Sequence, residues 1–312
     1  MKTITLARRR VDPTILEVTD SDVRLQRLCG IPTTATGPLK TQGMAALETS
    51  LGRGDGGQWR VESVVSSRAG TRIVLSAHGK ALELEMLWAA CPETGVVSRR
   101  DRLTNRSGTP VTVFKCQVRI AFPPARYEAY IQDSRWSNEN QGAWIPLHAG
   151  RTTLTCAPGR TTQGGTPYAC LRRLDCRLGL AFHVLPKGNW AIHFNNHALG
   201  DFPLLPVVEL GLADENLRLV LPAGGVLELP EILVQALPGG EPQLAAPALH
   251  RFLLRRHFQR AKPEAPVVYN TWFDQFEILD VPRLRRQLAA AKAVGCEVFT
   301  IDAGWYGAGE GN

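Results

Sequence analysis

The sequence lacks the features that define several large classes of protein. Its longest apolar runs fall short of the roughly 18 residues that a membrane-spanning helix needs, so we expect no membrane partner. The first residues contain no apolar segment of the kind found in a secretion signal. The seven cysteines form no C-x-x-C pair, and their odd number and wide spacing favour reduced, mostly buried thiols. Together these absences predict a cytoplasmic protein.

The chain also lacks a strong charge of either sign. Its 36 basic and 29 acidic residues leave a net charge of +7 over 312 residues. Arginines gather at 8–10 and at 251–260, but neither group alternates with aromatic residues as in proteins that bind single-stranded nucleic acid. We therefore expect no nucleic-acid partner. A hydrophobic content of 44% excludes a disordered chain, and the length predicts one large domain plus part of another.

Residues 1 to about 240 alternate between apolar and polar side chains with the period of two that is typical of β-strands. Leu82, Leu84 and Met86 share one face of such a strand, and residues 72–77 precede it across a turn at 78–80. Later apolar sets with the same alternation are Phe114, Cys116, Val118 and Ile120, then Leu180, Phe182 and Val184, then Leu217, Leu219 and Leu221. Because no helical stripe longer than two turns interrupts them, these strands predict a large antiparallel sandwich of two sheets.

The pattern changes at the proline- and glycine-rich segment 238–242, which is typical of a linker. Apolar residues at helical spacing then predict an amphipathic helix over about 245–260. We therefore divide the chain into a sandwich domain at 1–243, a linker helix at 244–262 and a different architecture at 263–312.

In this last part, predicted buried strands at 267–270 and 297–302 flank a helix. Asp280 is the expected N-cap of that helix, and Gly295 is its expected C-terminal cap. A strand–helix–strand unit of this kind has parallel strands and a right-handed crossover. Two parallel strands and one helix leave apolar faces uncovered, so we expect the chain to be a fragment of a longer protein.

Ligands of parallel α/β structures meet the carboxyl ends of the strands, where segments 270–274 and 301–307 lie in this chain. Trp272 follows the first strand, and Asp302 follows the second. A carboxylate accepts hydroxyl hydrogen bonds and an indole offers a flat apolar face, so the combination suits a sugar. The alternative is structural: Trp272 and Trp305 plug the mouth of a barrel and Asp302 caps a loop. The spacing alone does not separate the two.

The segments Tyr269–Trp272 and Phe299–Gly307 resemble the opening of the catalytic barrel in glycoside hydrolase family 36, the melibiase-type α-galactosidases. Upstream segments that resemble the N-terminal β-supersandwich of that family are Thr94–Asn105, Trp136–Glu139, 159–162 and Leu229–Glu231. The resemblance implies a mainly β fold, in which a large antiparallel β-supersandwich is followed at 263–312 by the first βαβ unit of a truncated (β/α)8 barrel.

The resemblance also implies a retaining α-galactosidase that hydrolyses terminal α-linked galactose from oligosaccharides by means of two carboxylates. In the family these carboxylates lie on later barrel strands, so no catalytic residue is expected within this chain. Two substrate-binding residues carry over. Trp272 matches the tryptophan that lines the galactose pocket, and Asp302 matches the first of two adjacent aspartates that hold sugar hydroxyls. No metal or cofactor is expected.

The sequence departs from the family pattern at two positions. Ala303 stands where the second aspartate is usual, and Phe273 replaces a common glutamate after the first-strand tryptophan. Another α-hexoside, an N-acetylated sugar or a galactosyl transfer therefore stays open as an alternative activity. A non-catalytic carbohydrate-binding sandwich is the alternative from another class. The resemblance is also compatible with a homo-oligomer.

Other patterns favour structural roles. His193 and His197 have the spacing of a metal-binding pair, but they lie on a predicted strand without a third ligand, so no metal site is expected. The segment 136–139 is expected at the surface or in sheet packing rather than at a sugar site. Cys296 begins the second barrel strand, away from its carboxyl end, which argues against a nucleophile.

Overall fold

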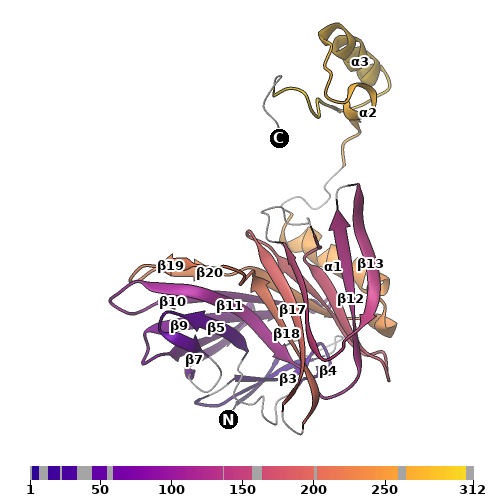
Figure 1. The fold of residues 1–312 in the computed structure, drawn as a ribbon. Helices are drawn as coiled ribbons and strands as arrows, with labels where there is room; N and C mark the ends of the chain where they lie inside the picture. Colours follow the sequence, from indigo (N-terminus) through magenta and orange to yellow (C-terminus); the bar gives the residue numbers. More distant parts are fainter. Residues whose placement is uncertain are drawn as a thin grey trace. The chain divides into compact units, whose positions relative to one another are not determined.

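The computed structural model describes residues 2–6, 13–21, 23–33, 44–54, 59–135, 137–156, 164–199, 202–258 and 265–306. The chain divides into two compact units, Met1–Leu253 and Leu254–Asn312. Strands make up nearly all of the regular structure of the first unit (Figure 1).

The strands of the first unit are β1 (Lys2–Leu6), β2 (Thr14–Val18), β3 (Val23–Leu28), β4 (Ile31–Pro32), β5 (Ala45–Thr49), β6 (Gly52–Gly54), β7 (Arg60–Ser67), β8 (Gly70–Ala77), β9 (Leu82–Ala90), β10 (Val97–Asn105), β11 (Val111–Ala121), β12 (Tyr127–Arg135), β13 (Asn138–Pro146), β14 (Gly150–Cys156), β15 (Tyr168–Arg173), β16 (Gly179–Leu185), β17 (Trp190–Leu199), β18 (Phe202–Leu212), β19 (Leu219–Leu221), β20 (Val226–Glu228) and β21 (Glu231–Ala236). After them come the 3-10 turn η2 (Pro238–Gly240), α1 (Pro242–Arg256), β22 (Val268–Asn270), α2 (Trp272–Gln275), α3 (Val281–Ala293) and β23 (Val298–Thr300).

Two large antiparallel sheets form the sandwich. One is ten-stranded in the order β13-β12-β15-β16-β21-β10-β9-β8-β7, with β20 paired to β10, and the other is seven-stranded in the order β14-β17-β18-β11-β5-β6, with β19 paired to β11. The mainly β, antiparallel prediction is confirmed. A four-stranded sheet, β1 to β4, was not predicted, and its Leu16 and Leu28 join the same hydrophobic core.

The core is built by the alternation that the sequence displays. Leu82, Leu84 and Met86 of β9 are at most 1% exposed, while the glutamates between them lie at the half-buried outer face. The predicted hairpin is present, since Ala77 of β8 pairs with Leu82 of β9. Fully burying a side chain of this size contributes about 1.5–3 kcal/mol, so one strand face supplies a large share of the driving force.

The prediction for Phe114 is wrong. The alternation placed it inward together with Cys116, yet Phe114 is 37% exposed while Val113 and Cys116 are buried. A β-bulge between Val113 and Lys115, opposite β5, inserts one residue into the strand. Side chains alternate between the two faces of a strand with a period of two, so one inserted residue breaks the alternation. The pattern read from the residues after the bulge therefore gives the wrong face for the residues before it.

Helix α1 packs on the ten-stranded sheet. It spans Pro242–Arg256, so it starts and ends a few residues before the predicted 245–260. Phe252 is 5% exposed and packs in a cluster with Val96 and Leu233. The side-chain amide of Gln235 on β21 donates to the Ala245 carbonyl at 2.8 Å. These contacts hold α1 against the outer face of the sheet (Figure 1).

A charged network joins β11, β17 and β18. Glu209 accepts hydrogen bonds from Lys115 Nζ at 2.7 Å and from Arg119 Nε at 2.7 Å. Asp214 accepts from His193 Nε2 at 2.8 Å and lies 3.1 Å from Lys115 Nζ. The hydrogen bond from His193, followed by the nearby Lys115 charge, holds the pKa of Asp214 well below its ordinary value despite partial burial.

The depressed pKa of Asp214 makes part of the sandwich stability dependent on pH. A carboxyl whose folded pKa lies below the unfolded value of about 3.9 stabilises the fold above that value and loses this contribution as the pH falls through the folded pKa. We expect Asp214→Asn to destabilise the protein at neutral pH, and this deficit to shrink below about pH 4. Urea unfolding at several pH values measures this loss of stability, and Asp133→Asn, at an exposed aspartate, is the control. A deficit that stayed constant down to acidic pH would contradict the assignment.

The second unit contains the predicted strand–helix–strand order. β22 and β23 pair in parallel. The Asp280 side chain accepts from the Arg283 amide at the start of α3, as predicted. The prediction that both strands are buried is wrong, because Val268 is 50% exposed and Val298 is 40% exposed. A two-stranded sheet and one helix do not cover both faces of the strands.

Within the described part of the chain, no helix combines the length and apolar character that a membrane span requires. The seven cysteines, all of which lie in that part, form no disulfide. Burial raises the pKa of the Cys170 thiol to about 12, so this cysteine is a protonated core residue.

Candidate functional site

The two parallel strands bring the predicted site residues to one edge. Asn270, the last residue of β22, pairs with Thr300, the last residue of β23. The rings of Tyr269 and Phe299 stack at 5.1 Å one residue earlier and fix this register. Trp272 and Asp302 each follow their strand by two residues, so both lie beyond the same carboxyl edge of the sheet.

Hydrogen bonds from the first strand end orient Asp302. The side-chain amide of Asn270 donates to Asp302 Oδ2 at 2.6 Å, and the Asp302 amide donates to Thr271 Oγ1 at 3.1 Å. Thr271 is fully buried, whereas the side chain of Asp302 is exposed. The carboxylate is therefore held in a defined direction while it remains accessible to a ligand with hydroxyl groups.

Trp272 lies in a short helix that the sequence prediction treated as a loop. Its amide donates to Asn270 Oδ1 at 2.8 Å, so one asparagine side chain bridges both strand ends. Trp272 is the first residue of helix α2, and its half-buried ring packs edge-on against Phe276 at 5.3 Å. This packing leaves the indole partly accessible at the same edge as Asp302.

Trp305 and Gly304 complete the loop after β23. Trp305 Nε1 donates to the backbone carbonyl of Asp302 at 3.0 Å, although the ring itself is 69% exposed. Gly304 has φ of +80°, and its backbone approaches the Glu277 carbonyl so closely that an added Cβ would lie 2.1 Å from that oxygen. The loop conformation that presents Asp302 thus depends on a glycine at this position.

Asn270 is the site residue that the sequence prediction missed. The sequence does contain a signal for Asn270, because an amide side chain at the end of a parallel strand lies opposite the end of the neighbouring strand.

The residues that depart from the family pattern differ in exposure. Phe273 is 88% exposed, and Ala303 is half-buried.

The patterns predicted to be structural have partners or lie at the surface. Among the described residues no group of three or more histidine, cysteine or acidic side chains could hold a metal ion. His193 contacts Asp214 and lies 3.0 Å from Thr153 Oγ1, while the side chain of His197 and all of Trp136 lie outside the described residues. Glu139 is exposed on β13 and accepts from the Ser137 amide.

Comparisons with known proteins give one consistent family. Residues 58–177 match the model of the glycosyl hydrolase family 36 N-terminal domain. The alignment with α-galactosidase 1 of Pediococcus pentosaceus is 23% identical over 245 residues, and it covers 75% of this chain and 32% of that protein. The chain is 21% identical over 234 residues to the probable α-galactosidase G of Emericella nidulans, covering 72% of this chain and 31% of the relative.

Solved structures share the fold over nearly the whole chain. The α-galactosidase of Lactobacillus brevis superposes with a TM-score of 0.78 at 15% identity, covering 98% of this chain and 49% of that one. The family 36 α-galactosidase AgaA of Geobacillus stearothermophilus gives 0.79 at 15% identity, covering 98% and 50%. The chain spans about a third of the length of the curated relatives and about half of the solved structures. As the sequence motifs predicted, the match over residues 58–177 is to the N-terminal domain of glycosyl hydrolase family 36.

Proposed function

We propose that this chain is the N-terminal part of a retaining α-glycosidase that hydrolyses terminal α-linked galactose from oligosaccharides. The family match and the α-galactosidase relatives support this. Variants of the Geobacillus stearothermophilus enzyme have been solved with stachyose and with raffinose, and we propose substrates of that class here. The observation that carries the proposal is the shared edge of β22 and β23, where an indole and an oriented carboxylate meet.

In this proposal the present residues bind and orient the sugar. Asp302, directed by the Asn270 amide, accepts hydroxyl hydrogens of the terminal sugar, and Trp272 contacts an apolar face of its ring. Retaining hydrolysis uses a nucleophile and an acid/base about 5 Å apart, and no residue of this chain is assigned to either role. The proposal places both on further barrel strands of a longer protein.

Ala303 bears on which sugar is accepted. It offers no hydrogen-bonding group beside Asp302, and a hydrogen bond to a charged group contributes about 1.5–3 kcal/mol. We propose that discrimination among α-hexosides is weaker than in a site with two adjacent aspartates. Comparing hydrolysis of nitrophenyl α-galactoside, α-N-acetylgalactosaminide and α-glucoside by the complete enzyme determines the preferred sugar.

The role of Asp302 is tested in the enzyme encoded by the complete reading frame. We expect Asp302→Asn to lower kcat/KM on nitrophenyl α-galactoside about 10- to 150-fold, which corresponds to the loss of roughly 1.5–3 kcal/mol. The matched control is Asp280→Asn in the same unit, because asparagine caps a helix as well as aspartate does. The assignment fails if both variants keep the parent activity, or if the complete enzyme does not hydrolyse any of the three α-glycosides.

A further inference from the structure

The outer face of the ten-stranded sheet bears a continuous patch of aromatic and amide side chains. The patch crosses β13, β12, β15, β16 and β21, which are consecutive in the sheet order. On these strands the inward residues, such as Ala129, Phe182 and Val234, belong to the core. The residues alternating with them therefore point outward, where an antiparallel sheet ordinarily meets solvent. Here helix α1 covers them instead.

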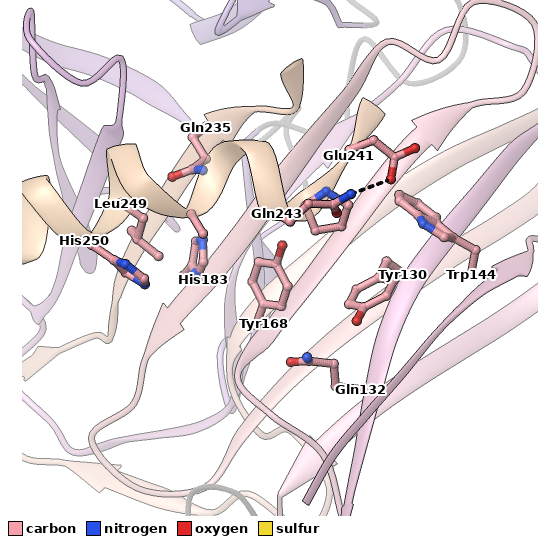
Figure 2. A pocket seen from close by; sticks show the side chains of 12 residues that line it. Tyr130, Gln132, Trp144, Tyr168, His183, Gln235, Glu241, Gln243, Leu249 and His250 are labelled. Carbon is pink, nitrogen blue, oxygen red and sulfur yellow. Dashed lines mark hydrogen bonds between the residues drawn. The ribbon is translucent and has the colours of Figure 1, made fainter. Parts of the chain in front are cut away.

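A pocket of about 380 Å³ lies between this face and the first turns of α1. Its sheet side is formed by Tyr130, Trp144, Tyr168, His183 and Gln235 (Figure 2). The volume falls within the roughly 300–1,000 Å³ that is typical of small-molecule sites. All lining residues belong to the first unit.

The aromatic rings form an unbroken row along the pocket. Trp144 and Tyr130 lie 5.5 Å apart, Tyr130 and Tyr168 lie 6.3 Å apart, and Tyr168 and His183 lie 4.6 Å apart, all between ring centroids. The Tyr130 phenol lies directly over Gly142, where an added Cβ would overlap it. Gly142 thus makes room for the ring, so the sheet is shaped to hold this row of aromatic side chains.

Two buried polar atoms of the pocket have no hydrogen-bond partner among the described residues. They are Gln235 Oε1 and His183 Nε2. Gln235 is only 4% exposed, and its Nε2 donates to the Ala245 carbonyl, so the amide orientation is fixed and Oε1 is its unused acceptor. Oε1 exposes almost no surface in this structure, so a ligand hydroxyl reaches it only after neighbouring side chains move. A buried acceptor without a partner costs stability, and a hydrogen bond from such a hydroxyl would remove that cost.

The carboxylate that lines the pocket is paired, and one of the pocket's two histidines is uncharged. The carboxylate, Glu241, is paired with Arg172 at 3.2 Å and with Arg177. Burial, with a smaller effect from His250, lowers the pKa of His183 to about 3, so its imidazole is uncharged at ordinary pH. A cationic ligand would find no unpaired carboxylate in the pocket lining. A neutral ligand with hydroxyl groups and an apolar face suits the row of rings and the unused acceptor.

We propose that this pocket binds a neutral saccharide, with Gln235 Oε1 accepting a sugar hydroxyl hydrogen and the row of aromatic rings contacting the ring C–H groups. The choice of a saccharide among neutral hydroxylated ligands rests on the proposed function. The binding itself requires no hydrolysis, so the two proposals can fail separately. The pocket would give the sandwich a carbohydrate-binding role of its own.

The test is a titration of the 312-residue chain, labelled with ¹⁵N-tryptophan, with raffinose and with methyl α-galactoside. The indole N–H signals of Trp144 and Trp272 are assigned by Trp144→Phe and Trp272→Phe, so that binding at the pocket and binding at the strand edge give separate responses. We expect the Trp144 signal to shift. Gln235→Met should weaken this response about three- to tenfold, the effect of losing one neutral hydrogen bond.

The chain offers a matched control. Gln117 is also buried, its Nε2 donates to the Leu212 carbonyl at 2.8 Å, and its Oε1 has no partner among the described residues, but it does not line the pocket. Gln117→Met should therefore change stability in the same way and leave the Trp144 titration unchanged. If Gln235→Met does not fold, His183→Phe keeps the ring against Tyr168, removes the unused nitrogen and should weaken binding. A Trp144 signal that does not respond to either sugar, or that responds equally in Gln235→Met and the parent, overturns the proposal.

Discussion

Replacing Asp101 by asparagine should destabilise the sandwich by about 3–5 kcal/mol, because it leaves a buried guanidinium without its counter-charge. Arg99 and Asp101 are 1% and 3% exposed. Arg99 donates to Asp101 through Nε at 2.8 Å and through Nη2 at 2.6 Å, and its Nη1 donates to the Met44 carbonyl at 2.9 Å. The guanidinium carbon also lies 5.1 Å from the ring centre of Trp88. Asparagine keeps the size of the side chain but not the charge.

The control is an exposed pair that joins the same strand, β10, to β20. Arg102 and Glu228 form an ion pair with both side chains about half exposed, and Glu228→Gln should cost no more than about 1 kcal/mol. Urea unfolding followed by far-ultraviolet circular dichroism reports the sheets of both variants. The double variant Arg99→Met, Asp101→Leu should recover much of the loss, since it removes both charges and keeps apolar volume. Equal effects of Asp101→Asn and Glu228→Gln would contradict the buried-pair interpretation.

The parts of the fold that local sequence determines could be predicted, and the parts that depend on distant strands could not. Alternation alone placed Leu82, Leu84 and Met86 inward, because period-two patterning is a property of one strand. The same rule gave the wrong face for Phe114, since the bulge beside it arises from pairing with β5, more than sixty residues upstream. A bulge leaves no mark in a binary pattern until the partner strand is known.

The candidate site shows the same division. The strand ends could be predicted from two short apolar runs, and the structure brings Trp272 and Asp302 to one edge, while their contact with sugar stays a prediction. The bridge made by Asn270 was missed because it depends on the register of two strands about thirty residues apart. The pocket in the sandwich has no linear motif at all. Its rings come from alternate positions of separate strands, and only the sheet order makes them neighbours.

Gly304→Ala should destabilise the second unit by about 2–5 kcal/mol, the largest effect that we expect there. Two costs combine in it. The residue has φ of +80°, and a left-handed conformation costs a non-glycine residue about 1–2 kcal/mol. The added Cβ would also lie 2.1 Å from the Glu277 carbonyl oxygen and 3.1 Å from Leu279 Cγ, and forcing atoms into a packed site costs about 1–3 kcal/mol more.

Gly295→Ala separates these two costs, because Gly295 has a similar φ of +87° but no atom within 4 Å of its added Cβ. The backbone penalty is therefore common to both variants, and the difference between them measures the steric overlap with Glu277. Hydrogen exchange of the Asp302 amide, which donates to Thr271 Oγ1, reports opening of the loop. Exchange should be about 5- to 150-fold faster in Gly304→Ala than in Gly295→Ala, the equivalent of roughly 1–3 kcal/mol. Since Trp305 also donates to the Asp302 carbonyl, a displaced loop carries the proposed sugar-binding carboxylate away from Asn270. Equal exchange in the two variants would show that the close approach of Gly304 to Glu277 does not hold Asp302 in place.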